Sequence, residues 1–195
     1  MGYIYDKLLE GKLPGYKSIP QVAQDFSFDG WSNPERIGAL IAAQAQKAGM
    51  IGFTTTLLGG PAIIATLPFN VAGVFCLQIQ MVGAIAKIKG YDIKSRQVKT
   101  FVLGCLLGQK FSEILKASGT QIGSSVAVNL LTNLSPELMV RINRKIGLRL
   151  AKKVGTKGVI KFWKAIPIVS GVICGGFDWR ATSMVGKTAE TISLV

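Results

Sequence analysis

The longest apolar stretch of the chain runs from Ala48 to Ala86 and contains no Asp, Glu, Lys or Arg. Gly59-Gly60-Pro61 interrupts it, since glycine frees the backbone and proline removes an N–H donor. Pro68 marks a second break. The pattern therefore predicts two helices, ending at Leu58 and starting at Phe69, that form an apolar hairpin at the centre of the fold.

The rest of the chain is also divided into helix-length segments, and runs that alternate polar and apolar residues are scarce. The sequence predicts an all-α fold, a compact helical bundle with a central glycine-rich hairpin. Residues 1–33 are predicted to form an N-terminal aromatic and basic arm with one short helix. Residues 34–195 are predicted to form a single domain, with helices over 34–58, 69–89, 93–116, 120–131, 136–153 and 168–193, and a brief one around Trp163.

Local signals place several helix ends. Asn33-Pro34-Glu35 and Ser135-Pro136-Glu137 each combine a capping side chain, a proline in the first turn and an acid that the helix dipole favours. Gly90 suits the left-handed position after a helix, and Asp92 is expected to cap the next one. Glycines within the helices, such as Gly49, Gly104 and Gly175, indicate close approach between helices.

The two halves of the apolar stretch are both marginal as membrane spans, which need about 20 apolar residues. The first is broken by Gly-Gly-Pro, and the second contains Asn70, Gln78 and Gln80, which would need partners in lipid. A hairpin buried in protein explains the same residues. We favour the buried hairpin and leave insertion open.

The C-terminal half contains a long basic segment. From Leu138 to Phe177 there is no acidic residue, and Met139, Ile142, Ile146 and Leu150 share one face of the predicted helix. A basic amphipathic helix of this kind is typical of membrane surfaces, although a core-facing helix with a solvated outer face fits the pattern equally well. The candidate membrane or anion-binding residues are Arg141, Arg144, Lys145, Arg149, Lys152, Lys153, Lys157, Lys161 and Lys164.

The net charge of +13 extends this picture to the whole chain. This charge indicates an anionic membrane lipid or a membrane protein as partner. The alternative interpretation is that the charge keeps an apolar chain soluble. Nucleic acid is disfavoured, because no recognised reading motif is present. A homo-oligomer is left open.

Cysteine usage and the N-terminus indicate a compartment. Cys76, Cys105 and Cys174 are widely spaced within apolar runs, which favours buried free thiols and a reducing cytoplasmic setting. The first 20 residues lack the apolar core of a signal peptide. We expect a cytoplasmic protein that is peripheral or integral to the membrane.

Motifs for catalysis are poor. The chain has no histidine, the commonest general base and metal ligand. Ala181 to Thr188 resembles a phosphate-binding loop, but it has no preceding strand and is interpreted as coincidence. Asp178 is expected to form a structural ion pair. The sequence therefore predicts no catalytic, cofactor or metal site and no enzyme.

Two blocks, residues 67–108 and 166–190, resemble the bacterial EcsC family. They share a Leu-Pro start, a glutamine-bearing apolar helix, a Gly-Tyr-Asp turn and a late Ile-Pro segment followed by Gly-Gly-Phe-Asp. The resemblance implies an apolar helical protein without an agreed enzymatic activity. Carried over by position, the structural motif residues are Pro68, Gly90, Asp92, Pro167, Gly175, Gly176 and Asp178.

These observations lead to two hypotheses on function. The first is a non-enzymatic helical protein that associates with anionic membrane through its basic half. The alternative is a colicin-like pore-forming protein whose hairpin, residues 48–86, inserts into the bilayer.

Overall fold

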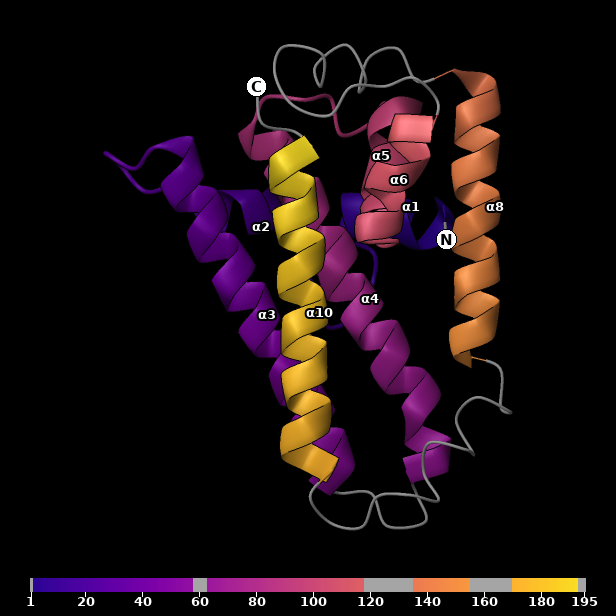
Figure 1. Ribbon diagram of the computed structural model, residues 1–195. Coiled ribbons are helices and arrows are strands. Elements are labelled where there is room, and N and C mark those ends of the chain that lie inside the picture. Colours follow the sequence, from indigo (N-terminus) through magenta and orange to yellow (C-terminus); the bar gives the residue numbers. More distant parts are fainter. Residues whose placement is uncertain (1, 58–62, 118–134, 155–169, 193–195) are drawn as a thin grey trace.

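The computed structural model describes residues 2–57, 63–117, 135–154 and 170–192. Within these ranges the chain is helical with no strand, which confirms the all-α prediction. The helices are α1 (Gly2–Glu10), α2 (Ile19–Asp25), α3 (Asn33–Leu57), α4 (Ile63–Ile88), α5 (Arg96–Cys105), α6 (Gln109–Ala117), α8 (Pro136–Val154) and α10 (Ser170–Ile192) (Figure 1).

Helix α4 is the central helix of the bundle. It contacts α3 and α10 on one side, α5 on another, and the N-terminal helices α1 and α2 (Figure 1). Its residues Ile79, Met81 and Ile85 are completely buried. The segment Val71–Ile88 is long and apolar enough to cross a membrane, but 72% of it is buried inside the protein, as expected of a core helix too. The apolar hairpin prediction is met by α3 and α4, which pack together.

Helices α3 and α10 lie antiparallel and form the most extensive helix pair (Figure 1). Two glycines face each other there: a Cβ at Gly175 would lie 2.8 Å from the Gly49 carbonyl oxygen, and a Cβ at Gly49 would lie 3.1 Å from that of Gly175. At a second point, a Cβ at Gly186 would meet Ile41. Small residues thus allow the close approach that the glycine pattern predicts.

The N-terminal segment contains two helices rather than the single one predicted. Tyr5 and Leu8 of α1 and Ile19 of α2 are buried in the same core as α4. The Tyr5 hydroxyl donates a 2.6 Å hydrogen bond to the Ile93 carbonyl oxygen. A capping box at Ser18 and Gln21 starts α2, so this short helix is specified locally.

One predicted helix start and two predicted caps are wrong. Helix α4 begins at Ile63, so the apolar residues before Pro68 are helical and the proline lies inside the helix. The cap of α3 is Ser32, not Asn33: its N–H and hydroxyl both donate to Glu35, which lowers the pKa of that carboxyl group. Ser95, not Asp92, caps α5.

The predicted helix over residues 93–116 is two helices. Gly108 adopts a φ of +60° between α5 and α6, and the Leu107 and Gly108 N–H groups close tight turns on Gly104 and Cys105. The Phe111 ring packs where a Cβ of Gly104 would lie, at 2.5 Å. The glycines thus let the chain turn and seat this ring in the core.

Candidate functional site

Helix α8 carries the basic residues for which the sequence predicts a membrane or anion-binding role. Ser135 caps it, since its hydroxyl accepts a 3.3 Å hydrogen bond from the Leu138 N–H. Hydrogen bonds from the Glu137 backbone and from Ser135 lower the pKa of Glu137 in the first turn. Every later charged residue of α8 is basic. This end of the helix is therefore fixed by the predicted Ser-Pro-Glu signal.

One face of α8 packs on the body and the opposite face is exposed. Ile142 is completely buried, Met139 packs against the core, and α5 is the main neighbour. Arg141, Arg144 and Lys145 are exposed. The predicted separation of apolar and basic residues thus holds over the first half of the helix.

The exposed face of α8 is not purely basic. Val140 is 67% exposed and Leu148 is 54% exposed. On a helix with about 3.6 residues per turn, both lie on the same side as Arg144. These two apolar residues lie outside the apolar face that the sequence predicts for this helix. We define the α8 outer face as Val140, Arg141, Arg144, Lys145 and Leu148.

The remaining candidate residues lie beyond what the structure describes. Arg149, Lys152 and Lys153 belong to α8, but their side chains are outside the described part. Lys157, Lys161 and Lys164 lie in the undescribed range 155–169. The structure thus brings together Arg141, Arg144 and Lys145.

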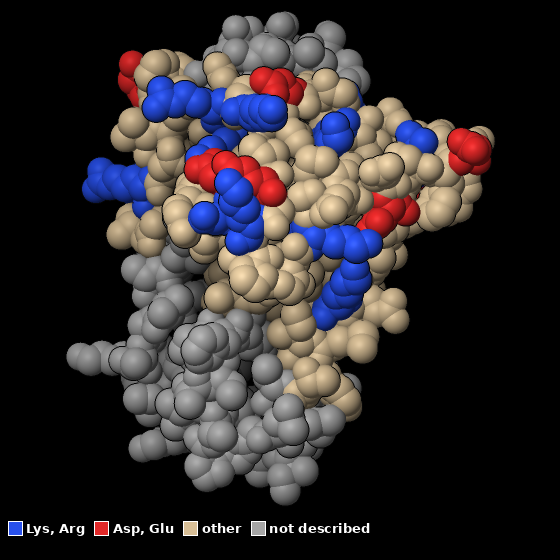
Figure 2. All heavy atoms as spheres, turned by 180° about the vertical axis from the view of Figure 1, so that it is seen from behind, with Lys and Arg blue, Asp and Glu red and all other residues tan. Residues whose placement is uncertain are grey.

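Elsewhere the surface charges are mixed. Seen from behind, the molecule shows Asp and Glu interspersed among Lys and Arg (Figure 2). Ion pairs in the N-terminal region join Lys17 to Asp25 at 2.7 Å and Lys99 to Asp6 at 2.7 Å. The α8 outer face itself contains no acid; the single acid of α8, Glu137, lies one turn before Arg141.

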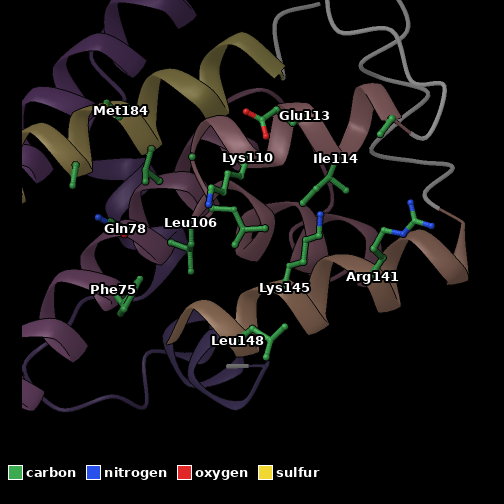
Figure 3. A pocket seen from close by; sticks show the side chains of 15 residues that line it. Phe75, Gln78, Leu106, Lys110, Glu113, Ile114, Arg141, Lys145, Leu148 and Met184 are labelled. Atoms are coloured by element: carbon green, nitrogen blue, oxygen red, sulfur yellow. The ribbon is translucent and has the colours of Figure 1, made fainter. Parts of the chain in front are cut away.

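A cavity of about 950 Å³ lies between α8, α6, α4 and α10 (Figure 3). Its apolar walls include Phe75 of α4, Leu106 after α5 and Val185 of α10, all of them buried. Gln78 also lines it, and the Gln78 side chain donates a 3.1 Å hydrogen bond to the Thr182 hydroxyl. This hydrogen bond engages the NH₂ group of the Gln78 side chain, which is then less available to bind another group.

Charged residues line the same cavity at its outer part. Arg141 and Lys145 extend from α8, and Lys110 and Glu113 belong to α6 (Figure 3). All four side chains are exposed. Two of the predicted anion-binding residues therefore border an apolar cavity, which the sequence could not indicate. Lys110 was missed because the segment was predicted to be a continuous helix; Gly108 before it was the available signal.

Two of the motif residues taken from the family resemblance, Gly90 and Asp92, have local roles at the end of α4 and in the turn that follows it. Gly90, with a φ of +82°, ends α4 as the Tyr91 N–H bonds to Ala86 and the Gly90 N–H to Lys87. The Asp92 carboxylate accepts a 2.9 Å hydrogen bond from the Lys94 N–H in a turn.

The other motif residues are distributed over α4 and α10. Gly175 contacts α3, Gly176 is exposed, and Asp178 is half-buried. Pro68 is helical, with its side chain outside the described part, and Pro167 lies outside the described residues. Among the motif residues that the structure describes, Gly90 and Asp92 therefore lie in the turn after α4, whereas Gly175, Gly176 and Asp178 lie on α10.

The segment that resembles a phosphate-binding loop has helical geometry. Ala181 to Thr188 lies in the middle of α10, where backbone N–H groups bond within the helix. The Thr188 hydroxyl donates to the Met184 carbonyl oxygen at 2.8 Å. In the described part of the chain, no group of three His, Cys, Asp or Glu side chains is placed to hold a metal ion.

The side chains of two of the three cysteines, Cys76 and Cys105, are described, and both are buried free thiols as predicted. Burial raises the pKa of the Cys76 thiol and raises that of Cys105 well above its usual value. Such thiols react slowly, because the thiolate is the reactive form.

Comparison with known proteins gives no relative: no family model, no curated protein and no solved structure matches the chain. The resemblance to the EcsC family therefore stays a prediction that rests on the residues alone.

Proposed function

We propose that this protein is a non-enzymatic helical protein that associates peripherally with anionic membrane through α8 and the basic residues that follow it. The observation that carries the proposal is the α8 outer face, where Arg141, Arg144 and Lys145 are exposed beside Val140 and Leu148. Basic and apolar side chains on one helix face suit the boundary between headgroups and acyl chains.

The energies involved are adequate for reversible binding. Each Lys or Arg close to an anionic leaflet contributes about 1 kcal/mol. Three described side chains would give about 3 kcal/mol on that scale, before the contribution of Val140 and Leu148. Six further basic residues follow in the sequence from Arg149 to Lys164. The charge of the whole chain, +13, would add long-range attraction.

The membrane surface in this proposal is cytoplasmic. Buried free thiols at Cys76 and Cys105 support a reducing compartment. Binding to the outer face of α8 leaves α4 in the core, where it is mostly buried. The protein would therefore remain folded on the surface.

Flotation with lipid vesicles tests the proposal. Wild-type protein should float with vesicles that contain phosphatidylglycerol and stay behind with pure phosphatidylcholine at low salt. A triple variant should lose most of this binding, because it removes three positive charges from one face of α8. Its substitutions are Arg141→Gln, Arg144→Gln and Lys145→Gln.

A matched control removes the same charge elsewhere. Lys47, Lys87 and Lys94 are exposed and lie outside α8. Their triple replacement by Gln should leave most of the binding intact. Equal recovery with neutral and anionic vesicles, or equal losses in both triple variants, would contradict a role for the α8 outer face.

A further inference from the structure

The cavity between α8, α6, α4 and α10 has the size of a ligand site. Its volume of about 950 Å³ falls near the upper end of the range of about 300 to 1,000 Å³ that is usual for small-molecule sites. Helices from distant parts of the sequence form its walls, so it depends on the complete bundle. Met184 of α10 and Leu148 of α8 also line it and are exposed, so solvent reaches the cavity.

The walls and the rim of the cavity differ in chemistry. Buried apolar side chains, such as Phe75, Leu106 and Val185, form the inner part. The rim holds three cations, Lys110, Arg141 and Lys145, and one carboxylate, Glu113. Glu113 lies three residues after Lys110 on α6, so it can offset that charge. Arg141 and Lys145 on α8 then supply the positive charge of the rim.

This arrangement matches a molecule with one apolar chain and one anionic end. Apolar walls alone would favour a neutral hydrophobe, and an exposed basic rim alone would bind phosphate only weakly. An acyl chain against Phe75 and Val185, with its acidic group near Arg141, would satisfy both parts. Arginine is well suited to carboxylate and phosphate groups, which it can bind with two parallel hydrogen bonds.

We infer that this cavity binds a single-chain anionic amphiphile, a long-chain fatty acid or a lysophospholipid, with its headgroup at Arg141 and Lys145. The site shares Arg141, Lys145 and Leu148 with the α8 outer face, but it takes up a single molecule and needs no bilayer. It would make the protein a lipid-binding protein even when it is free in solution.

Fluorescence titration in the absence of vesicles tests the inference. The probe is 11-(dansylamino)undecanoic acid, a fatty acid whose emission rises in an apolar site. We expect saturable binding to wild-type protein that palmitate or lysophosphatidic acid displaces; which of the two competes at lower concentration identifies the headgroup. Hexadecanol, the neutral analogue, and inorganic phosphate, which has no chain, should compete at least tenfold less well.

Variants locate the binding. Ala181 lines the cavity on α10, so Ala181→Trp should fill it and weaken probe binding at least tenfold. Met184→Glu, at a 40% exposed position of the wall, should do the same by repulsion without disturbing the core. The double variant Arg141→Ala, Lys145→Ala should also weaken binding, whereas the exposed pair Lys47→Ala, Lys87→Ala should not.

The outcomes separate this inference from the membrane proposal. Absence of saturable probe binding, competition by hexadecanol equal to that by palmitate, or unchanged affinity in both Ala181→Trp and Met184→Glu would overturn it. Vesicle flotation of Ala181→Trp is measured in parallel. Flotation without amphiphile binding in wild-type protein would remove the cavity site alone, and amphiphile binding without flotation would remove the peripheral membrane role alone.

Discussion

Gly175 and Gly49 bring the backbones of α3 and α10 into direct contact. A Cβ at position 175 would lie 2.8 Å from the Gly49 carbonyl oxygen and 3.3 Å from the Phe53 Cβ, so the helices would have to move apart. We predict that Gly175→Ala lowers the free energy of unfolding by about 1 to 3 kcal/mol, as overpacking usually does. Urea unfolding followed by circular dichroism measures this change.

The neighbouring glycine supplies the control. Nothing lies within 4 Å of a Cβ at Gly176, which is exposed in the same helix. Gly176→Ala should stabilise the protein by up to about 1 kcal/mol, because alanine favours the helix. Similar effects of the two substitutions would mean that the contact between α3 and α10 is looser than described.

Tyr5 makes stability depend on pH. Burial, together with the charges of Asp6 and Asp92, raises the pKa of its phenol well above the usual value of about 10. The folded state therefore holds this proton more tightly than the unfolded state does. The resulting stability is complete below about pH 10 and is lost as the pH rises above it.

Tyr5→Phe should reveal both roles of this hydroxyl. At neutral pH we predict a loss of about 1 to 3 kcal/mol, because the Ile93 carbonyl oxygen loses its donor. Above pH 10 the free energy of unfolding should fall less steeply in the variant than in the wild type. Parallel curves from urea unfolding between pH 8 and 11 would show that Tyr5 ionisation is not coupled to folding.

Among the elements, α1 shows how a short N-terminal helix joins the core. Leu8 is completely buried there, whereas Tyr3 is 72% exposed. Leu8→Ala should cost about 2 to 5 kcal/mol. Tyr3→Ala should cost less than about 1 kcal/mol, the value of its exposed contact with Lys7. If thermal unfolding shows no difference between the two, α1 is an arm that the core does not need.

Strong local signals made several elements predictable. The predicted limits of α3, α8 and α10 agree with the structure within about two residues, since each combines apolar periodicity with a cap or a breaker. The end of α4 at Gly90 follows from the same logic. Helices α1 and α2 were harder to predict because they are short. In addition, the aromatic residues of this N-terminal segment follow no clear helical spacing.

The split between α5 and α6 depends on a contact that local patterns do not contain. Gly104 and Gly108 are compatible with a continuous helix in sequence, and only the packing of Phe111 on Gly104 shows why the chain turns. The cavity is harder still, since it joins Phe75, Lys110, Arg141 and Val185 from four helices. Sequence periodicity indicated the basic face of α8, but it did not indicate the cavity that this helix forms with α4, α6 and α10.

For the whole molecule, the two functional hypotheses differ in what happens to α4. It stays in the core if the protein binds peripherally, and it leaves the core if the protein forms a pore. Insertion of Val71–Ile88 into a bilayer would expose the core, because 72% of that segment is buried. We predict that anionic vesicles loaded with carboxyfluorescein retain the dye when the protein binds at neutral pH. Rapid leakage in proportion to bound protein would favour the colicin-like alternative.

Peripheral association with an anionic membrane, as proposed above, depends on basic side chains. Fractionation of cells that express the protein, with separate washes of the membranes in 1 M salt and in carbonate, tests it most directly. The Debye length falls to about 3 Å at 1 M salt, so an electrostatic attachment should be weakened. We expect a membrane-bound protein that the salt wash releases. Retention through carbonate, or recovery only in the soluble fraction, would contradict it.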